Sequence, residues 1–457
     1  MSAIIITTIL GIIIMYLGLT KHKEILSPVA IAGLLLTIYL SLKGWGLDSK
    51  YFHDMVIFDN FSIAFNISMT IITILIFIFG IDYFKRMEYH VAEQYALMIF
   101  ALMGAFLMTS FSNLIMLFLG IEILSIPLYI LAGGKKNSSR SNEASFKYFM
   151  LGSFATAFFL FGIALVYGAS ASFYLPEIKL YIAQFNGHLP PMVLIGLLFI
   201  LIGVAFKVAV APFHFWSPDV YEGSPTLVTA FMATVVKTAG FAAFYRLLGM
   251  GLLPLPVPLE KALWVMIGLS LLIGNIVALK QGNFKRLLAY SSIAHSGFIM
   301  LAMLSQHDTS ASVILYYTFV YSLATVPIFI IFILAKRASN GLEHISVFRG
   351  LYKEKPWLAV LFSIFLASLA GIPPSAGFIA KYQVFVLSIS QGYLFISMFA
   401  IMMALIGVYY YFMVMREAYT EGEYEFPVIV SKLNALVILI CGIGVIALGI
   451  FINRLSF

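Results

Sequence analysis

Long apolar stretches separated by short polar loops make up most of this chain of 457 residues. A bilayer core of about 30 Å requires about 20 mostly apolar residues per helix. Because a lipid environment leaves no water for unpaired backbone groups, such stretches are expected to be helical. We expect fourteen membrane-spanning helices, near residues 3–19, 25–42, 61–81, 94–111, 113–131, 145–169, 192–212, 225–247, 262–280, 286–304, 311–335, 357–388, 393–413 and 432–453. The pattern predicts an all-α polytopic membrane protein with one membrane domain.

Composition supports this class and excludes others. The chain is 62% hydrophobic and only 10% charged, whereas a soluble protein carries about 25% charged residues. Cys441 is the only cysteine, so neither an internal disulfide nor a cysteine-based iron–sulfur site can form. We therefore expect no cofactor in this chain, and no metal site at Asp219 and Glu222, which lack a histidine or cysteine at ligand spacing.

The basic residues indicate orientation rather than a nucleic-acid partner. The odd-numbered loops, starting with the one after the first helix, hold sixteen lysines and arginines, while the even-numbered loops and the C-terminal tail hold six. Since cytoplasmic loops carry the excess of basic residues, the odd loops are expected in the cytoplasm and both termini on the opposite side. In a bacterium this corresponds to a multi-pass protein of the inner membrane.

Two of the expected helices contain proline breaks. The seventh reads FKVAVAPFHF, with a lysine before Pro212, and the twelfth reads GIPPSAGFIAK, with a lysine after Pro373 and Pro374. Proline removes a backbone donor and interrupts a helix. Because the two lie five helices apart, they enter the membrane in opposite senses, as in inverted-repeat transporters. We expect N-terminal helices over 1–93, two inverted five-helix repeats (helices 4–8 over 94–247 and helices 9–13 over 262–413), and a last helix over 432–457.

A few ionisable residues fall inside the apolar stretches. They are Glu122, Lys207, Lys237 and Lys381, with His295 in a further stretch. A charge near the centre of a bilayer costs about 2.5–3.5 kcal/mol even on the lenient insertion scale. These side chains are therefore expected to face the protein interior, each other or water.

Two interpretations of these charges are open. A lysine and a glutamate can simply pair and hold two helices together, but here three amines share one buried carboxylate, Glu122. A buried amine without a counter-charge releases its proton easily, which a proton carrier requires. The alternative is a relay: Glu122 controls the proton on Lys207, which passes it to Lys237 and then to Lys381, with His295 as a possible intermediate.

The motifs around these residues resemble one family. The stretch FKVAVAPFHFWSPDVYEGSPTLVTAFMATVVKTAGF, with LGIEILSIPLYIL before it and KRLLAYSSIAHSGF and GIPPSAGFIAKYQVF after it, is similar to subunit N of the proton-pumping NADH-quinone oxidoreductases, the respiratory complex I enzymes. The resemblance covers about helices 3 to 14, and the PDVYEGSPT turn is its most specific part. It implies the antiporter-like fold and assigns the four charged residues to family positions; His295 matches a histidine better known in sister subunits.

The resemblance also implies partners. Sister antiporter-like subunit M and subunit K of the membrane arm, membrane lipids and protons are expected, with flavin, iron–sulfur clusters and the quinone site in other subunits. The alternative is a subunit of a multi-component sodium/proton antiporter, which shares the lysines but usually differs at the PDVYEGSPT turn. A stand-alone solute carrier is disfavoured because the two helix breaks lack polar groups for a substrate.

Overall fold

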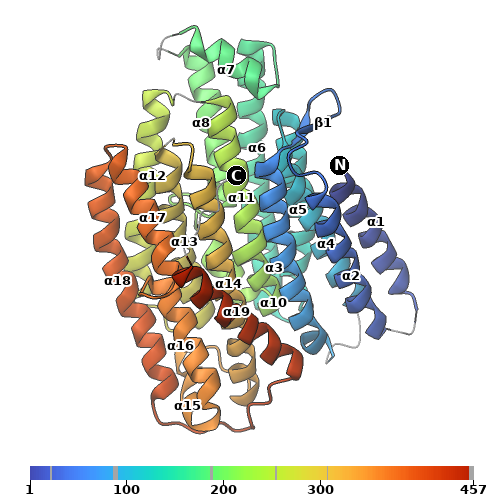
Figure 1. Ribbon diagram of the computed structural model, residues 1–457, viewed down its shortest axis with the longest axis vertical. Helices are drawn as coiled ribbons and strands as arrows, with labels where there is room; N and C mark the ends of the chain where they lie inside the picture. The colour runs from blue at the N-terminus through green and yellow to red at the C-terminus, as the bar shows by residue number, and fades with distance from the viewer. Residues whose placement is uncertain (21–22, 86–90, 186–188, 253–254, 306, 452–457) are drawn as a thin grey trace.

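Most helices of the chain stand side by side along the longest axis of the molecule (Figure 1). The computed structural model describes residues 1–457 except 21–22, 86–90, 186–188, 253–254, 306 and 452–457. The first part of the chain forms α1 (Ser2–Leu17), α2 (Leu26–Leu42), α3 (Asn60–Phe84), α4 (Val91–Ser110), α5 (Leu114–Ala132), α6 (Ser139–Ser170), α7 (Leu175–Ala183), α8 (Pro191–Lys207), α9 (Trp216–Gly223), α10 (Thr226–Phe231) and α11 (Lys237–Gly251).

The second part of the chain is also built from helices. It forms α12 (Val257–Ala278), α13 (Phe284–Leu304), α14 (Ser310–Ala338), α15 (Leu351–Glu354), α16 (Pro356–Ala370), α17 (Ala376–Ser390), α18 (Leu394–Tyr419) and α19 (Lys432–Ile450). Short 3-10 turns cover Lys23–Ile25 and Ile345–Phe348, and a π-helical segment, Met232–Val236, joins α10 to α11.

The predicted membrane helices agree closely with this architecture. Helix lies within each of the fourteen expected ranges. Over the described part of the chain, eleven helices are long and apolar enough to cross a membrane, and α1, α8, α16 and α17 are shorter apolar helices. The all-α membrane class is confirmed, while the number of fourteen crossings stays a prediction.

Both predicted helix breaks are present. The seventh span stops at Lys207, and α9 begins at Trp216 only after an irregular segment around Pro212. The twelfth is divided into α16, which ends at Ala370, and α17, which begins at Ala376. The sequence did not predict the π-helical segment in the eighth span. Such a segment marks a widened turn inside a helix, and it directly precedes Lys237.

Small residues allow neighbouring helices to pack closely. A Cβ added to Gly104 of α4 would meet the Leu124 amide of α5 at 2.5 Å, and one added to Gly162 of α6 would meet the Gly196 carbonyl of α8 at 2.6 Å. In the second part, Gly274 of α12 lies equally close to the backbone of Ala294 on α13. Membrane helices lack a hydrophobic force between them, so close contact at small residues supplies much of their association.

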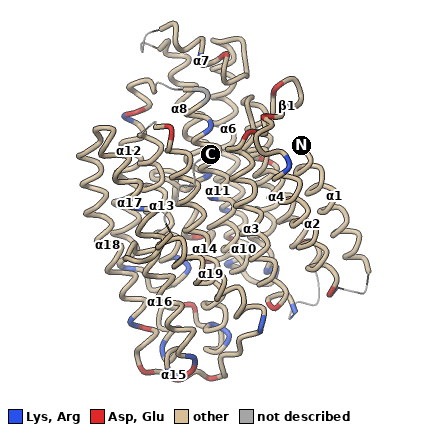
Figure 2. The backbone as a smooth tube through the Cα atoms, viewed as in Figure 1, with Lys and Arg blue, Asp and Glu red and all other residues tan. Residues whose placement is uncertain are grey.

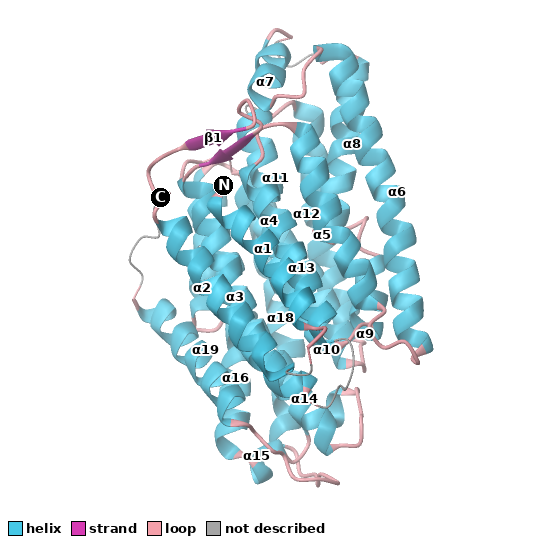
Figure 3. Ribbon diagram, turned by 90° about the vertical axis from the view of Figure 1, so that its right-hand side faces the viewer, coloured by secondary structure: helices cyan, strands magenta, loops and turns pink. Residues whose placement is uncertain are grey.

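A small β-hairpin adds to the helical fold. Strand β1 (Ser49–Tyr51) pairs antiparallel with β2 (Val56–Phe58), and the turned view places the hairpin at the same end of the molecule as α7 and opposite α15 (Figure 3). Directly after β2, Asp59 accepts a hydrogen bond from the Ser62 amide and so caps α3.

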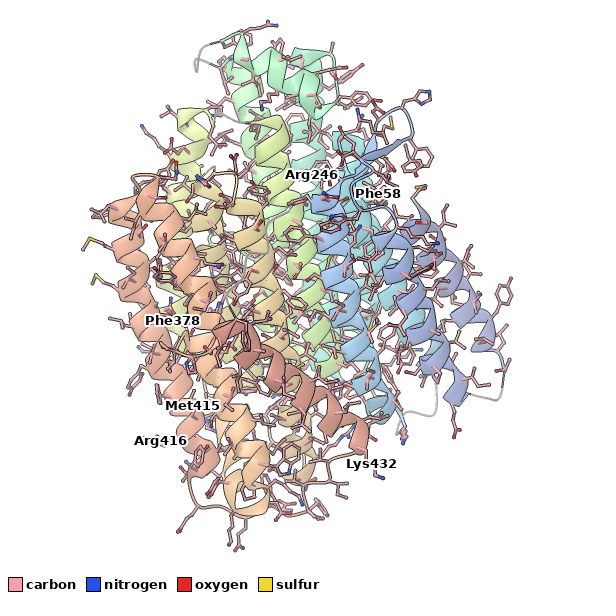
Figure 4. All side chains as sticks on the ribbon, in the orientation of Figure 1. Phe58, Arg246, Phe378, Met415, Arg416 and Lys432 are labelled. Atoms are coloured by element: carbon pink, nitrogen blue, oxygen red, sulfur yellow. The ribbon has the colours of Figure 1, made fainter. Side chains whose placement is uncertain are left out.

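Asp59 also forms an ion pair across the bundle. Arg246 near the end of α11, labelled close to Phe58 in Figure 4, donates to its carboxylate at 2.5 and 2.6 Å. The count of basic residues assigned Arg246 to an even-numbered loop, although the expected helix at 225–247 already included it. The loop assignment was wrong, because the arginine is 3% exposed and lies on α11.

Charged residues gather toward the ends of the bundle (Figure 2). At the end that carries α9, Arg286 of α13 binds Asp219 and Glu222, and Lys147 of α6 also binds Asp219. Lys285 is 1% exposed and donates to the carbonyls of Glu222 and Ser224. These bonds join α9 of the first half to α13 of the second half.

Candidate functional site

Three lysines lie in the interior of the bundle, as the sequence predicted. Lys207 ends α8, Lys237 begins α11 and Lys381 lies in the second turn of α17, and they are 5%, 5% and 6% exposed. Among the described residues, no carboxylate forms an ion pair with any of the three. Each amine is held instead by neutral oxygen atoms.

Lys207 is held by a hydroxyl group. Its ammonium donates to Oγ of Ser125 on α5 at 2.8 Å, and it lies 5.8 Å from the centre of the Tyr148 ring. Ser125 in turn donates to the Ile121 carbonyl one turn back along α5. The serine can therefore accept from the ammonium without leaving its own hydrogen unpaired.

Glu122 lies on α5 three residues before Ser125, so the two side chains occupy the same face one turn apart. Its carboxylate accepts from the Thr156 hydroxyl of α6 at 2.8 Å. A small cavity between α5, α6 and α8 is lined by Ser125, Thr156 and Lys207. The expectation of a well-buried carboxylate was wrong: Glu122 is only half-buried in this chain, because α5 and α6 lie at the outside of the bundle.

Lys237 directly follows the π-helical segment and reaches across to α13. Its ammonium donates to both the carbonyl and the hydroxyl oxygen of Ser292. Ser296, one turn further along α13, has its hydroxyl oxygen 3.0 Å from the Ser292 carbonyl and 3.0 Å from the carbonyl of Val208. Val208 follows Lys207 in the chain, so α13 links the first break to the central lysine.

His295 lies on the same helix, within a group of hydroxyls. Its Nδ1 is 2.8 Å from the Tyr317 hydroxyl and its Nε2 is 3.1 Å from the Tyr411 hydroxyl. The Tyr411 hydroxyl also bonds to Ser291, next to the serine that holds Lys237. In a neutral imidazole one ring nitrogen donates and the other accepts, so the ring can pass a proton between the two tyrosines.

Lys381 is held by the end of a helix. Its ammonium donates to the carbonyls of Leu369 and Ala370, at 3.0 and 2.8 Å, which are the last two residues of α16. The end carbonyls of a helix lack partners and carry partial negative charge, so they replace a carboxylate here. The chain turns at Gly371 with φ 85°, and a Cβ there would lie 2.8 Å from the lysine side chain.

A second small cavity connects His295 with this break. It is lined by His295, Tyr317 and Tyr321 from one side and by Ser368, Leu369, Gly377 and Ala380 from α16 and α17. The carbonyl of Leu369 is also an acceptor of Lys381. The structure thus places all five predicted residues in two groups, Glu122 with Lys207, and His295 between Lys237 and Lys381.

Sequence reasoning missed the hydroxyl groups that connect these residues. Ser125, Thr156, Ser292, Ser296 and Tyr411 carry no formal charge, so they do not stand out in an apolar stretch. One signal was available, because positions 291, 292, 295 and 296 form i, i+4 pairs on one face of a helix. In the part of the chain that the structure describes, no group of three or more His, Cys, Asp and Glu could hold a metal ion.

The fold and the interior lysines at two broken helices define the class of antiporter-like membrane proteins. The family model described as "NADH:quinone oxidoreductase/Mrp antiporter, TM" matches residues 111–407. A protein of Flavobacterium psychrophilum named NADH-quinone oxidoreductase subunit N is 38% identical over 457 residues, which cover 99% of each chain. This chain belongs to that family, and within it to the N subunits of NADH-quinone oxidoreductase.

Solved structures agree with this assignment. A chain of respiratory complex I from Thermus thermophilus, solved with bound Aureothin, has a TM-score of 0.80 and 31% identity, covering 98% of this chain and 97% of that chain. A chain of the Mrp complex from Dietzia sp. DQ12-45-1b has a TM-score of 0.83 at 17% identity, covering 98% and 94%. The second likeness shows the fold alone, so the sodium/proton antiporter alternative has no support beyond the shared fold.

Proposed function

We propose that this chain is a membrane-arm subunit of an NADH-quinone oxidoreductase and moves protons through its interior, while NADH oxidation and quinone reduction take place in other subunits. The observation that carries the proposal is the chemistry around the three buried amines. Lys207, Lys237 and Lys381 are held by hydroxyl and carbonyl oxygens rather than by carboxylates. An amine so placed is not fixed in its charged form by a partner, and it can gain or lose a proton.

The proposed path begins at Glu122 and Lys207. The carboxylate accepts a hydrogen bond from Thr156, and the amine donates one to Ser125. Thr156 and Ser125 both line the same small cavity. A change of side-chain rotamer brings Glu122 toward the amine and stabilises its proton; movement away releases the proton. The carboxylate acts as a control group for the first lysine.

The path continues along α13. Ser296 and Ser292 connect the break after Lys207 to Lys237. From there Ser291, Tyr411 and His295 lead to the cavity beside the α16–α17 break, where Lys381 lies. Five side chains, Glu122, Lys207, Lys237, His295 and Lys381, form the proposed relay.

The positions of the relay lysines also support a division of the chain into two repeats. We infer that residues 94–247 and 262–413 are two inverted five-helix repeats, with helices before and after them. Each proposed repeat contains one broken helix with a lysine at the break, Lys207 in the first and Lys381 in the second. Lys237 and Ser292 form one of the connections between the two proposed repeats.

The partners follow from the family. The chain is proposed to lie in a bacterial inner membrane, with both termini on the non-cytoplasmic side, beside sister subunit M and subunit K. Flavin, iron–sulfur clusters and the quinone site are assigned to other subunits. The half-buried Glu122 is consistent with a neighbouring subunit against α5 and α6.

Replacement of the central lysine tests the proposal. Assembled complexes that contain Lys237→Met are placed in liposomes, and NADH-driven acidification is followed with a pH-sensitive dye. We expect acidification to be lost while the subunit stays in the complex, because methionine has a similar length but cannot carry a proton. The control is Lys179→Met at an exposed position on α7. Undiminished acidification in Lys237→Met would refute the relay.

A further inference from the structure

An apolar groove on the outside of the bundle lies against the first helix break. It has a volume of about 630 Å³ and is formed by α8, by the segment between α8 and α9, and by α12. Its lining residues are almost all apolar: Ile195, Leu198, Phe199, Leu201, Ile202, Pro212, Phe213, Pro258, Ala262, Val265 and Met266, with Lys261 as the one charged member. This groove is separate from the two small cavities of the relay.

Two polar backbone atoms of the break bond to buried serines of neighbouring helices. The Ala211 amide donates to the Ser270 hydroxyl of α12, and the Val208 carbonyl accepts from Ser296. The outer side of the break therefore presents the ring of Pro212, which is exposed, and the half-buried Phe213. Irregular backbone at membrane depth is tolerated only when its polar groups are paired. Apart from Lys261, the side chains that line the groove therefore offer hydrocarbon contacts.

The groove runs inward from one end of the bundle. Its members on α12 begin at Pro258, in the first turn of that helix, and its members on α8 extend from Ile195 to Ile202. Seven residues of α helix span about 10 Å. This is a large part of one leaflet, whose hydrocarbon layer is about 15 Å deep. The length and direction fit an acyl chain that enters from the membrane surface.

Lys261 supplies a charge at the outer end of the groove. Its side chain is exposed, and the acid next to it, Glu260, accepts from the Tyr393 hydroxyl of α18 at 3.2 Å. A lysine near a helix end extends its ammonium to the membrane surface while its methylene stem stays in the apolar region. That position places a positive charge beside the head group of a lipid whose tail fills the groove.

We propose that this groove binds one acyl chain of an anionic phospholipid, with Lys261 at the phosphate of its head group. The tail packs against Pro212 and Phe213. The bound lipid therefore contacts the outer side of the helix break that follows Lys207. Such binding is independent of whether the relay conducts protons. It is therefore measured as binding rather than as transport.

The test uses the assembled complex in nanodiscs that contain phosphatidylglycerol with a photoreactive group on one acyl chain. After irradiation, labelled peptides are identified by mass spectrometry. We expect labels to concentrate on residues 195–202, 211–213 and 258–266. Ile195→Trp and Val265→Trp, both at exposed positions, fill the groove and should reduce this labelling several-fold. Leu405→Trp, an exposed apolar position on α18, is the matched control and should leave it unchanged.

A second comparison tests the head group. The phosphatidylglycerol probe should label the groove about fivefold more than a phosphatidylcholine probe, the factor that corresponds to about 1 kcal/mol for one lysine near an anionic lipid. Lys261→Gln should remove this preference and Lys261→Arg should keep it. Equal labelling by both probes, or labels spread evenly over the lipid-facing helices, would each overturn the proposal.

Discussion

The ammonium of Lys207 donates to the hydroxyl of Ser125 at 2.8 Å, so a cation at the end of one membrane helix is held by a neutral side chain of another. The serine lies one turn from Glu122, the acid proposed to control this lysine. A hydroxyl supports the amine in both its charged and neutral forms, since it can accept or donate a hydrogen bond.

Ser125→Ala removes this support. A hydrogen bond to a charged group contributes about 1.5–3 kcal/mol, so proton translocation is expected to fall about tenfold or more. NADH-driven acidification in proteoliposomes measures the effect. Ser125→Thr retains the hydroxyl and should retain most activity. Ser363→Ala on α16 is the matched control, because that serine bonds to the Ala359 carbonyl and the Tyr419 hydroxyl, away from the three lysines. Equal rates for both alanine variants would show that Ser125 has no special role.

Tyr411→Phe interrupts the bonds between Ser291 and His295. The ring and its packing stay, but the hydroxyl that joins the two groups is gone. A positioned proton donor typically contributes about 10²-fold or more to a transfer step, so a loss of at least about tenfold is expected. Tyr316→Phe is the control, since its hydroxyl bonds to the Leu448 carbonyl on α19 instead. If acidification by Tyr411→Phe matches the control, protons do not pass by way of His295.

Arg246→Met affects stability rather than transport. It leaves the carboxylate of Asp59 without the buried cation that now binds it. Breaking a buried ion pair costs about 3–5 kcal/mol, so the thermal transition of the purified complex should shift to lower temperature. Lys50→Met breaks an exposed pair with Asp54, in which both side chains are more than half exposed, and should change stability by about 0–1 kcal/mol. A shift no larger than that of Lys50→Met would contradict the structural role of Arg246.

The carboxyl group of Glu343 is expected to make the stability of the fold depend on pH. Burial raises the pKa of its carboxyl, but Lys285 and Lys336, with Asn283, oppose this more strongly and leave the pKa below its ordinary value. A lowered carboxyl pKa stabilises the fold above the ordinary glutamate pKa of about 4.3, and the contribution is lost as pH falls through the lowered value. The difference in melting temperature between wild type and Glu343→Gln should therefore be constant from about pH 7 to 5 and shrink at lower pH.

The control for this prediction is Glu423→Gln. Its carboxylate is 88% exposed and pairs with Lys353 at 3.4 Å, so the substitution should produce almost no difference at any pH. A difference for Glu343→Gln that grows as pH falls would have the wrong sign and would contradict the effect of Lys285 and Lys336.

Much of the fold could be predicted because lipid imposes strong rules on sequence. Apolar length locates the helices, and the prolines at 212, 373 and 374 locate the two breaks. The predicted site residues stand out for the same reason: a lysine or glutamate in an apolar stretch requires an explanation. Serine, threonine and tyrosine are tolerated in membrane helices, so Ser125, Ser292 and Tyr411 gave no comparable signal.

Other features depend on distant contacts that local pattern cannot show. Arg246 and Asp59 are 187 residues apart, and only the packing of α11 against α3 brings them together. The half-buried position of Glu122 likewise depends on where α5 lies in the bundle. The β-hairpin and α7 lie in segments too short to have a periodic signal, and both fall outside the predicted spans.

The hydroxyl of Ser296 has one hydrogen but two carbonyl neighbours, those of Val208 and Ser292, at equal distance. It can satisfy only one of them at a time, so the other is left to attract a different donor. When the hydrogen turns toward Val208, the Ser292 carbonyl is fully available to the Lys237 ammonium; when it turns back, that ammonium has a competitor. A rotation of a single bond thus changes how firmly the Ser292 carbonyl can hold the ammonium of Lys237.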